Sequence, residues 1–259
     1  MNDWNTSTDP EWMFWHLNDK VPERKRRLLA AAICRHIGHL MTEARCRRLL
    51  VEAQRLSVYG TKPVPCKPDF LLLTLDEVER CADNLALVKS LAAAAKLADH
   101  IGSFTSDFYY SGYSKSWGAF DHDLIASCNA AVAVCHAASS RLDLAHLAAQ
   151  AAHAVYRAAG GDDHKKRDPG EEAAQCALIR DVFPSHTQPV SFSSAWRTDT
   201  VLSLASQMYE SRDFSLMPIL ADALQDADCD NDEVLNHCRD ANQVHARGCW
   251  VVDLVLGKE

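Results

Sequence analysis

Reactive side chains are densest in the last stretch of the chain, residues 219–259. The segment ILADALQDADCDNDEVLNHCRDANQVHARGCWVVDLVLGKE holds two histidines, three cysteines and a tryptophan. His245 and Cys249 are four residues apart, so in a helix they would share a face. Cys229 or His237 could complete a tetrahedral zinc site, because His nitrogen and Cys sulfur are ligands that zinc prefers. The candidate metal or polar cluster is therefore Cys229, His237, His245 and Cys249.

The same residue types also describe a reduced, packed core. Val234, Leu235 and Cys238 occupy one apolar helical face, and Cys249 leads directly into an apolar run. No CxxC pair occurs in the sequence, which removes the most specific zinc and redox signatures. We therefore expect buried thiols, no metal and no cofactor, with the four candidate side chains too far apart to share one ion. We expect His245 near a helix start, bonded to backbone groups.

A second group of reactive side chains lies in the segment ICRHIGHL. His36 and His39 are three residues apart and could share a helical face, whereas Cys34 and His39 point in different directions around a helix. A Cys nucleophile with a His base would need proximity in space. Hydrogen bonds between helices are the ordinary role of such histidines, and we expect that role here.

Short motifs of common enzyme classes are absent from the sequence. It contains no Gly-rich phosphate loop, no HExxH and no GxSxG. The carboxylate pairs Asp162-Asp163 and Glu171-Glu172 stand in or beside polar turns, so we expect them to be solvated. These observations leave the common motif-defined enzyme classes unsupported.

A basic segment and an acidic segment stand near opposite ends of the chain. Residues 20–55 hold ten Lys and Arg against three Asp and Glu, a balance of +7, and residues 199–259 hold four against twelve, a balance of −8. The candidate anion-binding run consists of Arg24, Lys25, Arg26 and Arg27. Because cations in the first turn oppose the helix macrodipole, we expect the acidic C-terminal helices to pack near this run. Nucleic acid is disfavoured as a partner by the net charge of −8.

Length and composition limit the class of protein. At 259 residues the chain is near the upper size of one hydrophobic core, so one domain or two helical lobes are both reasonable. No stretch approaches the roughly 20 apolar residues of a membrane span, and the N-terminus does not read as a signal peptide. Ten cysteines, set mostly within apolar helical patterns, indicate reduced thiols. We expect a cytoplasmic protein that does not bind a membrane.

Hydrophobic spacing predicts an all-α fold, with helical hairpins packed as a bundle or an irregular array. Alanine-rich helices on either side of Ser139-Ser140-Arg141 are expected to pack closely as an antiparallel pair. The segment CWVVDLVL suits either a strand or a buried helix, and we take it as a helix. The predicted parts are an N-terminal hairpin with a basic face (1–60), a proline-rich linker (61–73), an alanine-rich bundle (74–160) and a C-terminal helical unit (161–259).

The two ends of the chain resemble a known family. The segments ILADALQDADCDNDEVLNHCRD and HARGCWVVDLVLGKE are similar to the C-terminal signature of a large family of uncharacterised, planctomycete-type bacterial proteins. The basic segment ERKRRLLAAAICRHIGHLMTEARCRRLLVEAQR resembles the family's N-terminal signature. The chain departs from the family at DANQVHARG, where a Gly-Pro-rich turn is usual. The resemblance implies no cofactor and no particular activity.

An aromatic segment between the helices offers the best candidate contact surface. Tyr, Phe and Trp among Ser and Gly suit a protein interface. The candidate interface residues are Phe108, Tyr109, Tyr110, Tyr113 and Trp117. We therefore expect a non-enzymatic interaction or scaffold module with a protein partner. The alternative is a metal-dependent or nucleic-acid-associated enzyme that uses the C-terminal His/Cys cluster.

Overall fold

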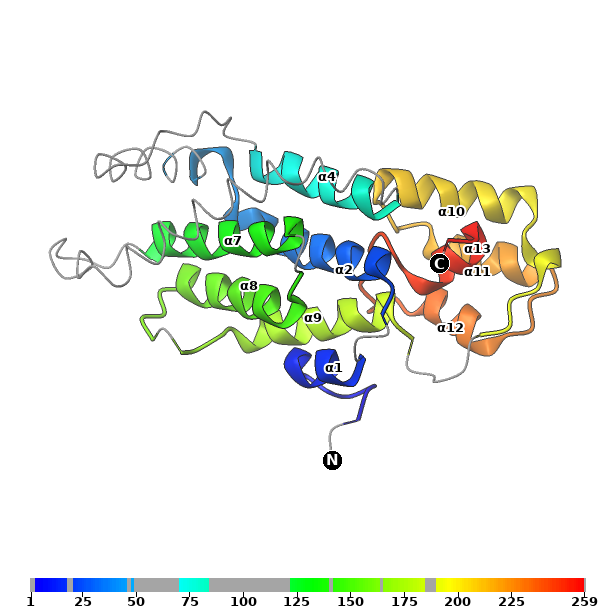
Figure 1. The fold of residues 1–259 in the computed structure, drawn as a ribbon. Helices are drawn as coiled ribbons and strands as arrows, with labels where there is room; N and C mark the ends of the chain where they lie inside the picture. The colour runs from blue at the N-terminus through cyan, green and yellow to red at the C-terminus, as the bar shows by residue number, and fades with distance from the viewer. Residues whose placement is uncertain are drawn as a thin grey trace, which may run out of the picture. The chain divides into compact units, whose positions relative to one another are not determined.

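The computed structural model of the chain describes residues 3–17, 21–45, 48, 70–83, 122–139, 142–163, 165–184 and 190–258. Within these ranges the regular secondary structure is helical, without a strand, so the predicted all-α class is confirmed (Figure 1). None of the described helices is both long and apolar enough to cross a membrane. The aromatic segment with Phe108, Tyr109, Tyr110, Tyr113 and Trp117 lies outside the described residues.

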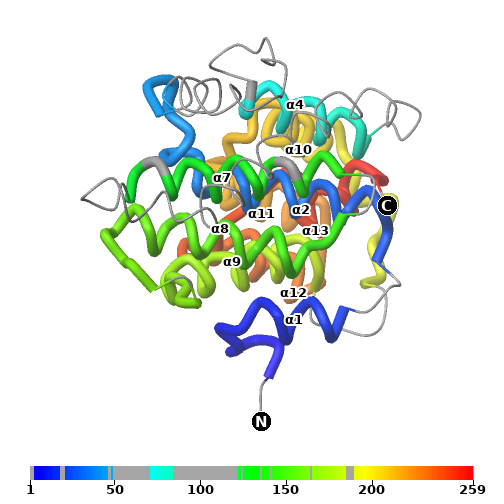
Figure 2. Tube along the Cα trace, turned by 60° about the vertical axis from the view of Figure 1, so that its left-hand side comes forward, coloured from blue at the N-terminus to red at the C-terminus, as the bar shows by residue number. Residues whose placement is uncertain are grey.

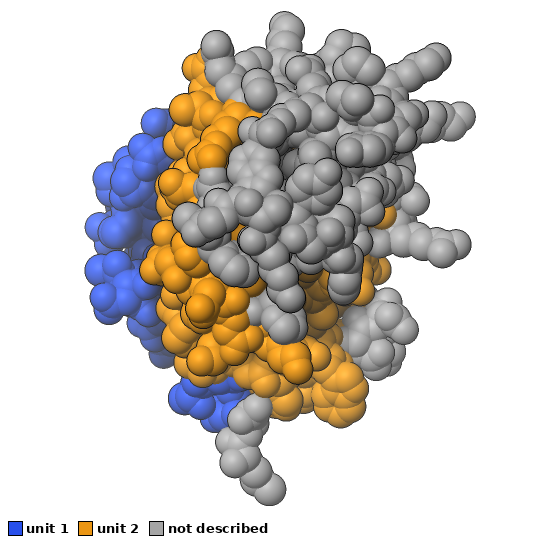
Figure 3. All heavy atoms as spheres, turned by 90° about the vertical axis from the view of Figure 1, so that its left-hand side faces the viewer, with its two compact units in different colours: residues 1–7, 176–259 blue, residues 8–175 orange. Residues whose placement is uncertain are grey.

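The chain divides into two compact units, which Figure 3 colours separately. Unit 1 comprises residues 1–7 and 176–259, and unit 2 comprises residues 8–175. The division falls inside helix α9 (Pro169–Val182), at a later residue than the expected start of a C-terminal part at 161. The first seven residues belong to unit 1 because the Arg180 guanidinium donates hydrogen bonds to the Trp4 and Ser7 carbonyls, at 2.7 and 2.5 Å.

Helices that pack side by side make up unit 2. They are α1 (Pro10–Leu17), α2 (Glu23–His36), α4 (Phe70–Asp83), α7 (His122–Ala138), α8 (Leu144–Ala158) and the first turns of α9, with a short 3₁₀ turn at Gly38–Leu40. Figures 1 and 2 both show α7 beside α8. Buried alanines on both helices, such as Ala130 and Ala151, allow this close approach. The predicted break between them is confirmed, and the Asp143 side chain caps α8.

Helix α4 begins earlier than the sequence suggested. Its first residue is Phe70, so the last four residues of the expected proline-rich linker, 70–73, are helical. Leu71, Leu75 and Val78 recur at helical spacing and are buried. The leucine run therefore belongs to the helix, and only residues 61–69 of the expected linker remain, outside the described part of the chain.

The basic run at the start of α2 is partly buried and paired within unit 2. Arg27 is 2% exposed and contacts Glu23 at 2.7 Å, four residues earlier on the same helix. The Arg24 Nε atom lies 3.2 Å from Asp83 on α4, and Arg26 donates to the Leu142 carbonyl at 2.6 Å. The acidic partners of Arg24 and Arg27 thus come from α4 and α2. The expected packing of the acidic C-terminal helices near this run stays a prediction. Two of the four candidate anion-binding residues, Arg24 and Arg27, are structural.

The described part of unit 1 contains the last turns of α9, a 3₁₀ turn at Ser194–Trp196 and the helices α10 (Asp199–Ser211), α11 (Met217–Asp226), α12 (Asp232–Arg239) and α13 (Trp250–Leu256). The N-cap side chains Thr198 and Asn231 accept hydrogen bonds from the first turns of α10 and α12. Apolar residues from all four helices share one core, among them Val201, Leu220 and Val251. This core fixes the end of α12 and the start of α13, which carry the reactive side chains described next.

The terminal CWVVDLVL segment is a helix, as expected. Trp250, Val251 and Val252 are buried in succession, so the segment is covered on most sides. The helix ends at Gly257, whose φ of 64° is a conformation that favours glycine. The Arg197 guanidinium donates to the carbonyls of Leu254 and Val255 at 2.8 and 3.1 Å, in the last turn, where helix carbonyls run out of intrahelical partners.

Candidate functional site

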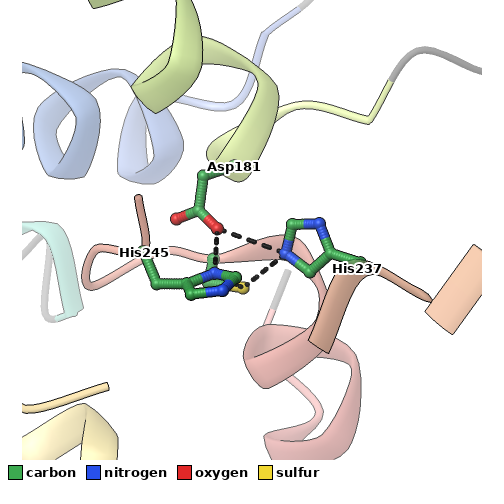
Figure 4. A group of neighbouring side chains, drawn as sticks. Asp181, His237 and His245 are labelled. Atoms are coloured by element: carbon green, nitrogen blue, oxygen red, sulfur yellow. Dashed lines mark hydrogen bonds and ion pairs between the residues drawn. The ribbon is translucent and has the colours of Figure 1, made fainter. Parts of the chain in front are cut away.

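Four reactive side chains of unit 1 converge on one point. Asp181 comes from the last turn of α9, His237 from the last turn of α12, His245 from the following loop, and Cys249 from the N-cap of α13. One nitrogen, oxygen or sulfur atom from each lies within 4.8 Å of the others (Figure 4). We expected Cys229, His237, His245 and Cys249 to be too far apart to share one ion, and for three of these four, His237, His245 and Cys249, this is wrong. Cys229 is not part of this group, which we call the Asp-His-His-Cys cluster.

The Asp181 carboxylate is the hub of the cluster. Its Oδ1 atom lies 2.8 Å from His245 Nδ1 and 3.2 Å from His237 Nε2. Its Oδ2 atom accepts a hydrogen bond from the backbone N–H of Ala246 at 2.8 Å. Because Ala246 follows His245, the carboxylate fixes the loop at both the side chain and the backbone.

Cys249 and Trp250 complete the surroundings of His237. The Cys249 sulfur lies 3.2 Å from His237 Nε2 and 3.9 Å from His245 Nδ1. The Trp250 indole N–H donates to His237 Nδ1 at 3.1 Å. An indole nitrogen only donates, so His237 Nδ1 must be unprotonated in this arrangement. The ring proton then lies on Nε2 and faces the Asp181 carboxylate.

The electrostatics of the cluster favour a carboxylate and a neutral thiol. Burial alone would raise the pKa of Asp181, but hydrogen bonds from His237 and His245 outweigh burial and lower that pKa below its usual value. Burial and the nearby Asp181 carboxylate raise the pKa of the Cys249 thiol well above its usual value. Since the thiolate is the nucleophilic form, Cys249 is not activated for nucleophilic attack in this arrangement.

Packing around the cluster explains why its side chains stay in place. Cys238 and Cys249 are both buried, as expected, with Val234 and Leu235 covering the same side of α12. The Gln243 side chain donates to the Ala177 carbonyl at 3.3 Å and holds the loop against α9. The seven cysteines whose side chains the structure describes are all buried.

Asp181 is the member of the cluster that the sequence analysis missed. It lies far before His237 in the chain, in the segment LIRDVF, and no spacing rule connects the two. One signal was present: a charged residue stands within an apolar helical stretch, directly before Val182 and Phe183. Acidic residues are almost never fully buried unless they are paired, so an Asp at such a position indicates a partner.

The Cys34, His36 and His39 group does not form a catalytic site. Cys34 is fully buried, and burial raises the pKa of its thiol far above the usual range. His36 lies 3.4 Å from the Glu171 carboxylate, and burial lowers the pKa of His36. The contact of His36 on α2 with Glu171 on α9 agrees with the expected role of this histidine between helices.

Glu171 is buried, contrary to the expectation of a solvated pair with Glu172. It is 5% exposed, and one carboxyl oxygen accepts a hydrogen bond from Gln175 at 3.0 Å. Burial raises the pKa of Glu171 to about 7. The sequence placed this residue beside a turn, but α9 begins at Pro169 and turns Glu171 inward.

The substitution Glu171→Gln is expected to remove a pH dependence of stability. The folded-state pKa of about 7 exceeds the unfolded value. Stability from the protonated carboxyl is therefore complete below the unfolded pKa and is lost as pH rises through about 7. At pH 8 the variant should be more stable than wild type by on the order of 1–3 kcal/mol, at about 1.4 kcal/mol per unit of pKa shift.

Denaturant unfolding of both proteins at pH 5 to 8 measures this effect. Because His36 lies 3.4 Å from Glu171, the difference between the two proteins reports Glu171 together with its coupling to His36. Parallel stability curves for wild type and Glu171→Gln across this range would show that Glu171 is ionised in the folded protein at pH 7.

Comparisons with known proteins return no family model, no curated protein and no solved structure that matches the chain. The family resemblance of the two ends therefore stays an expectation. Function has to be inferred from the chemistry and exposure of the chain's own residues.

Proposed function

We propose that the chain is a non-catalytic protein-interaction module of the cytoplasm. The observation that carries this proposal is Trp15 on α1, whose surface is 79% exposed. Met13, two residues earlier, is fully buried and anchors the same short helix. Tryptophan is enriched among the few interface residues that carry most of the binding energy. Burial of the described cysteines within apolar helical faces supports a reducing compartment.

The Asp-His-His-Cys cluster speaks against an enzyme. Catalytic metal sites keep one position open for water or substrate, whereas here four protein side chains converge on one point. Asp181 and Cys249 are each 0% exposed, so a substrate does not reach them in this arrangement. A metal-dependent enzyme is therefore not favoured by this geometry.

Internal pairing of the basic run speaks against a nucleic-acid partner. A backbone-binding surface needs accessible Lys and Arg. Arg24 and Arg27 are buried beside carboxylates, and the exposed Asp76 and the buried Glu79 each lie 2.6 Å from Arg35. A protein partner that contacts an exposed aromatic side chain fits these observations better.

Affinity capture with a Trp15→Ala variant tests the proposal. The tagged full chain is cross-linked in cells of the organism that encodes it, and captured proteins are quantified by mass spectrometry. Loss of a hot-spot tryptophan costs about 2 kcal/mol or more, so capture of the specific partner should fall by about tenfold or more.

Ile219→Ala provides the matched control. Ile219 is also exposed, at 52%, but it lies on α11 in the other unit. Its replacement should leave capture unchanged. Equal capture by wild type and Trp15→Ala would exclude Trp15 as the contact, and no enrichment over untagged cells would contradict the interaction role itself.

A further inference from the structure

We propose that Asp181, His237, His245 and Cys249 together bind one zinc ion. The ligand types are two imidazole nitrogens, one sulfur and one carboxylate oxygen, and each is a normal protein ligand of Zn²⁺. Sulfur and imidazole select against Mg²⁺ and Ca²⁺, which prefer oxygen ligands. This site is independent of Trp15 and of the proposed interaction role.

The spacing of the four atoms fits a tetrahedral ion. Metal–ligand bonds of about 2.0–2.3 Å place neighbouring ligand atoms about 3.4–3.6 Å apart around a tetrahedral centre. The four contacts measured in the cluster are 2.8, 3.2, 3.2 and 3.9 Å. These four values lie on both sides of the tetrahedral spacing, and the remaining pairs of ligand atoms lie within 4.8 Å. Side-chain shifts of about 1 Å would therefore bring the four atoms to the tetrahedral spacing. Figure 4 shows the three labelled side chains pointing toward a common centre.

Charge balance provides a second, separate argument. Asp181 is fully buried, and its hydrogen-bond partners are two histidines and the Ala246 N–H, none of which carries a permanent positive charge. A buried carboxylate needs a compensating cation. Zn²⁺ with one carboxylate, one thiolate and two neutral imidazoles gives a neutral site. Binding converts the Cys249 thiol to thiolate and releases its proton to solvent.

A closed site of this kind is structural. All four positions are supplied by protein groups, and the ion would join α9, the end of α12, the loop and the start of α13. These elements are short: α12 has 8 residues and α13 has 7. Helices of this length are not stable alone, and a small unit buries little apolar surface. An ion that links these helices would therefore stabilise the folded unit.

One contact must change when the ion binds. His237 can bind Zn²⁺ through Nε2 only if its ring proton moves to Nδ1. In the structure the Trp250 indole N–H donates to Nδ1 at 3.1 Å. After the proton moves, the protonated Nδ1 faces this same N–H. Two N–H groups cannot hydrogen-bond to each other, so the indole must shift or find another acceptor. Zinc binding should therefore change the fluorescence of Trp250, and this part of the signal should be missing from Trp250→Phe.

Metal content of the purified full chain tests the site. Wild type from cells grown with zinc, dialysed against a chelating resin, should retain one zinc per chain by plasma mass spectrometry. Cys249→Ser should retain less than a tenth as much. Cys229→Ala is the matched control, because Cys229 is buried in the same unit but is outside the cluster, and it should retain zinc as wild type does.

Cobalt binding by wild type keeps the test valid if Cys249→Ser does not fold. Chelator-treated wild type titrated with Co²⁺ should show the visible bands of a tetrahedral site and a thiolate-to-cobalt charge-transfer band. Both should disappear when one equivalent of Zn²⁺ is added, and Zn²⁺ should raise the melting temperature by several degrees. Three negative results with wild type would overturn the proposal: no retained zinc, no cobalt bands, and the same melting temperature with and without Zn²⁺. The four side chains would then form a hydrogen-bonded cluster without a metal.

Discussion

Asp181→Ala is expected to lower the free energy of unfolding by about 3–5 kcal/mol, the usual cost of removing one partner from a buried charged network. The substitution leaves the Ala246 N–H and two imidazole N–H groups without their acceptor at a position where the carboxylate itself is fully buried. If zinc is bound, it also removes a ligand. Denaturant unfolding followed by circular dichroism, with zinc and with a chelator, measures the loss.

Asp222→Ala is the control for this experiment. Asp222 lies on α11 with its side chain 75% exposed and pairs with Arg239 at 3.4 Å. Exposed pairs contribute about 0–1 kcal/mol, so this variant should remain close to wild type. A loss of stability for Asp181→Ala as small as that for Asp222→Ala would mean that the cluster does not hold unit 1 together.

Leu220→Ala is expected to cost about 2–5 kcal/mol, the range for truncating a buried leucine. Leu220 is fully buried in the core that α10, α11, α12 and α13 share. The cost has two parts: the lost burial of the side chain and the cavity that remains. Thermal and denaturant unfolding of the full chain measure it.

The neighbouring residue gives a matched comparison for the core. Ile219 is 52% exposed on the same helix, so Ile219→Ala removes a similar side chain from the surface and should change stability by less than about 0.5 kcal/mol. Equal effects of Leu220→Ala and Ile219→Ala would show that α11 is not packed as described.

Much of the helical architecture could be predicted because local signals agree with the tertiary structure. Thr198 and Asn231 stand where α10 and α12 begin, and their side chains bond to the first turns. The terminal WVVDLVL segment was ambiguous, since β-branched residues favour strands. Tertiary packing favours the helix, because five of the seven residues of this segment are buried. Such burial overrides the local preference for a strand.

The candidate site could be predicted only in part. His245 and Cys249 were identified by residue type, and the structure places them together. Their convergence was not predicted because no CxxC pair is present and the fourth group is an aspartate from a distant helix. Cys229 is closer to His237 in sequence than Asp181 is, but it lies elsewhere in the core. Spacing along the chain reports local neighbours, whereas this cluster depends on tertiary contacts between α9, α12 and α13.

Charge patterning could not identify the partners of the basic run for a similar reason. The balances of +7 and −8 are averages over long segments. Individual side chains pair with the nearest carboxylate, and for Arg24 and Arg27 this is on α4 or on the same helix. The net charge of a segment therefore predicts that the basic run Arg24 to Arg27 is paired with acidic groups. It does not identify the residues that supply them.

X-ray absorption at the zinc edge of the full-length protein tests the zinc site most directly. The site predicts one sulfur at about 2.3 Å and three nitrogen or oxygen neighbours at about 2.0–2.2 Å. The sulfur shell should be lost in Cys249→Ser and kept in Cys229→Ala. A zinc-free protein after purification and reconstitution, or a zinc shell with no sulfur in wild type, would contradict the assignment of Asp181, His237, His245 and Cys249 as one metal site.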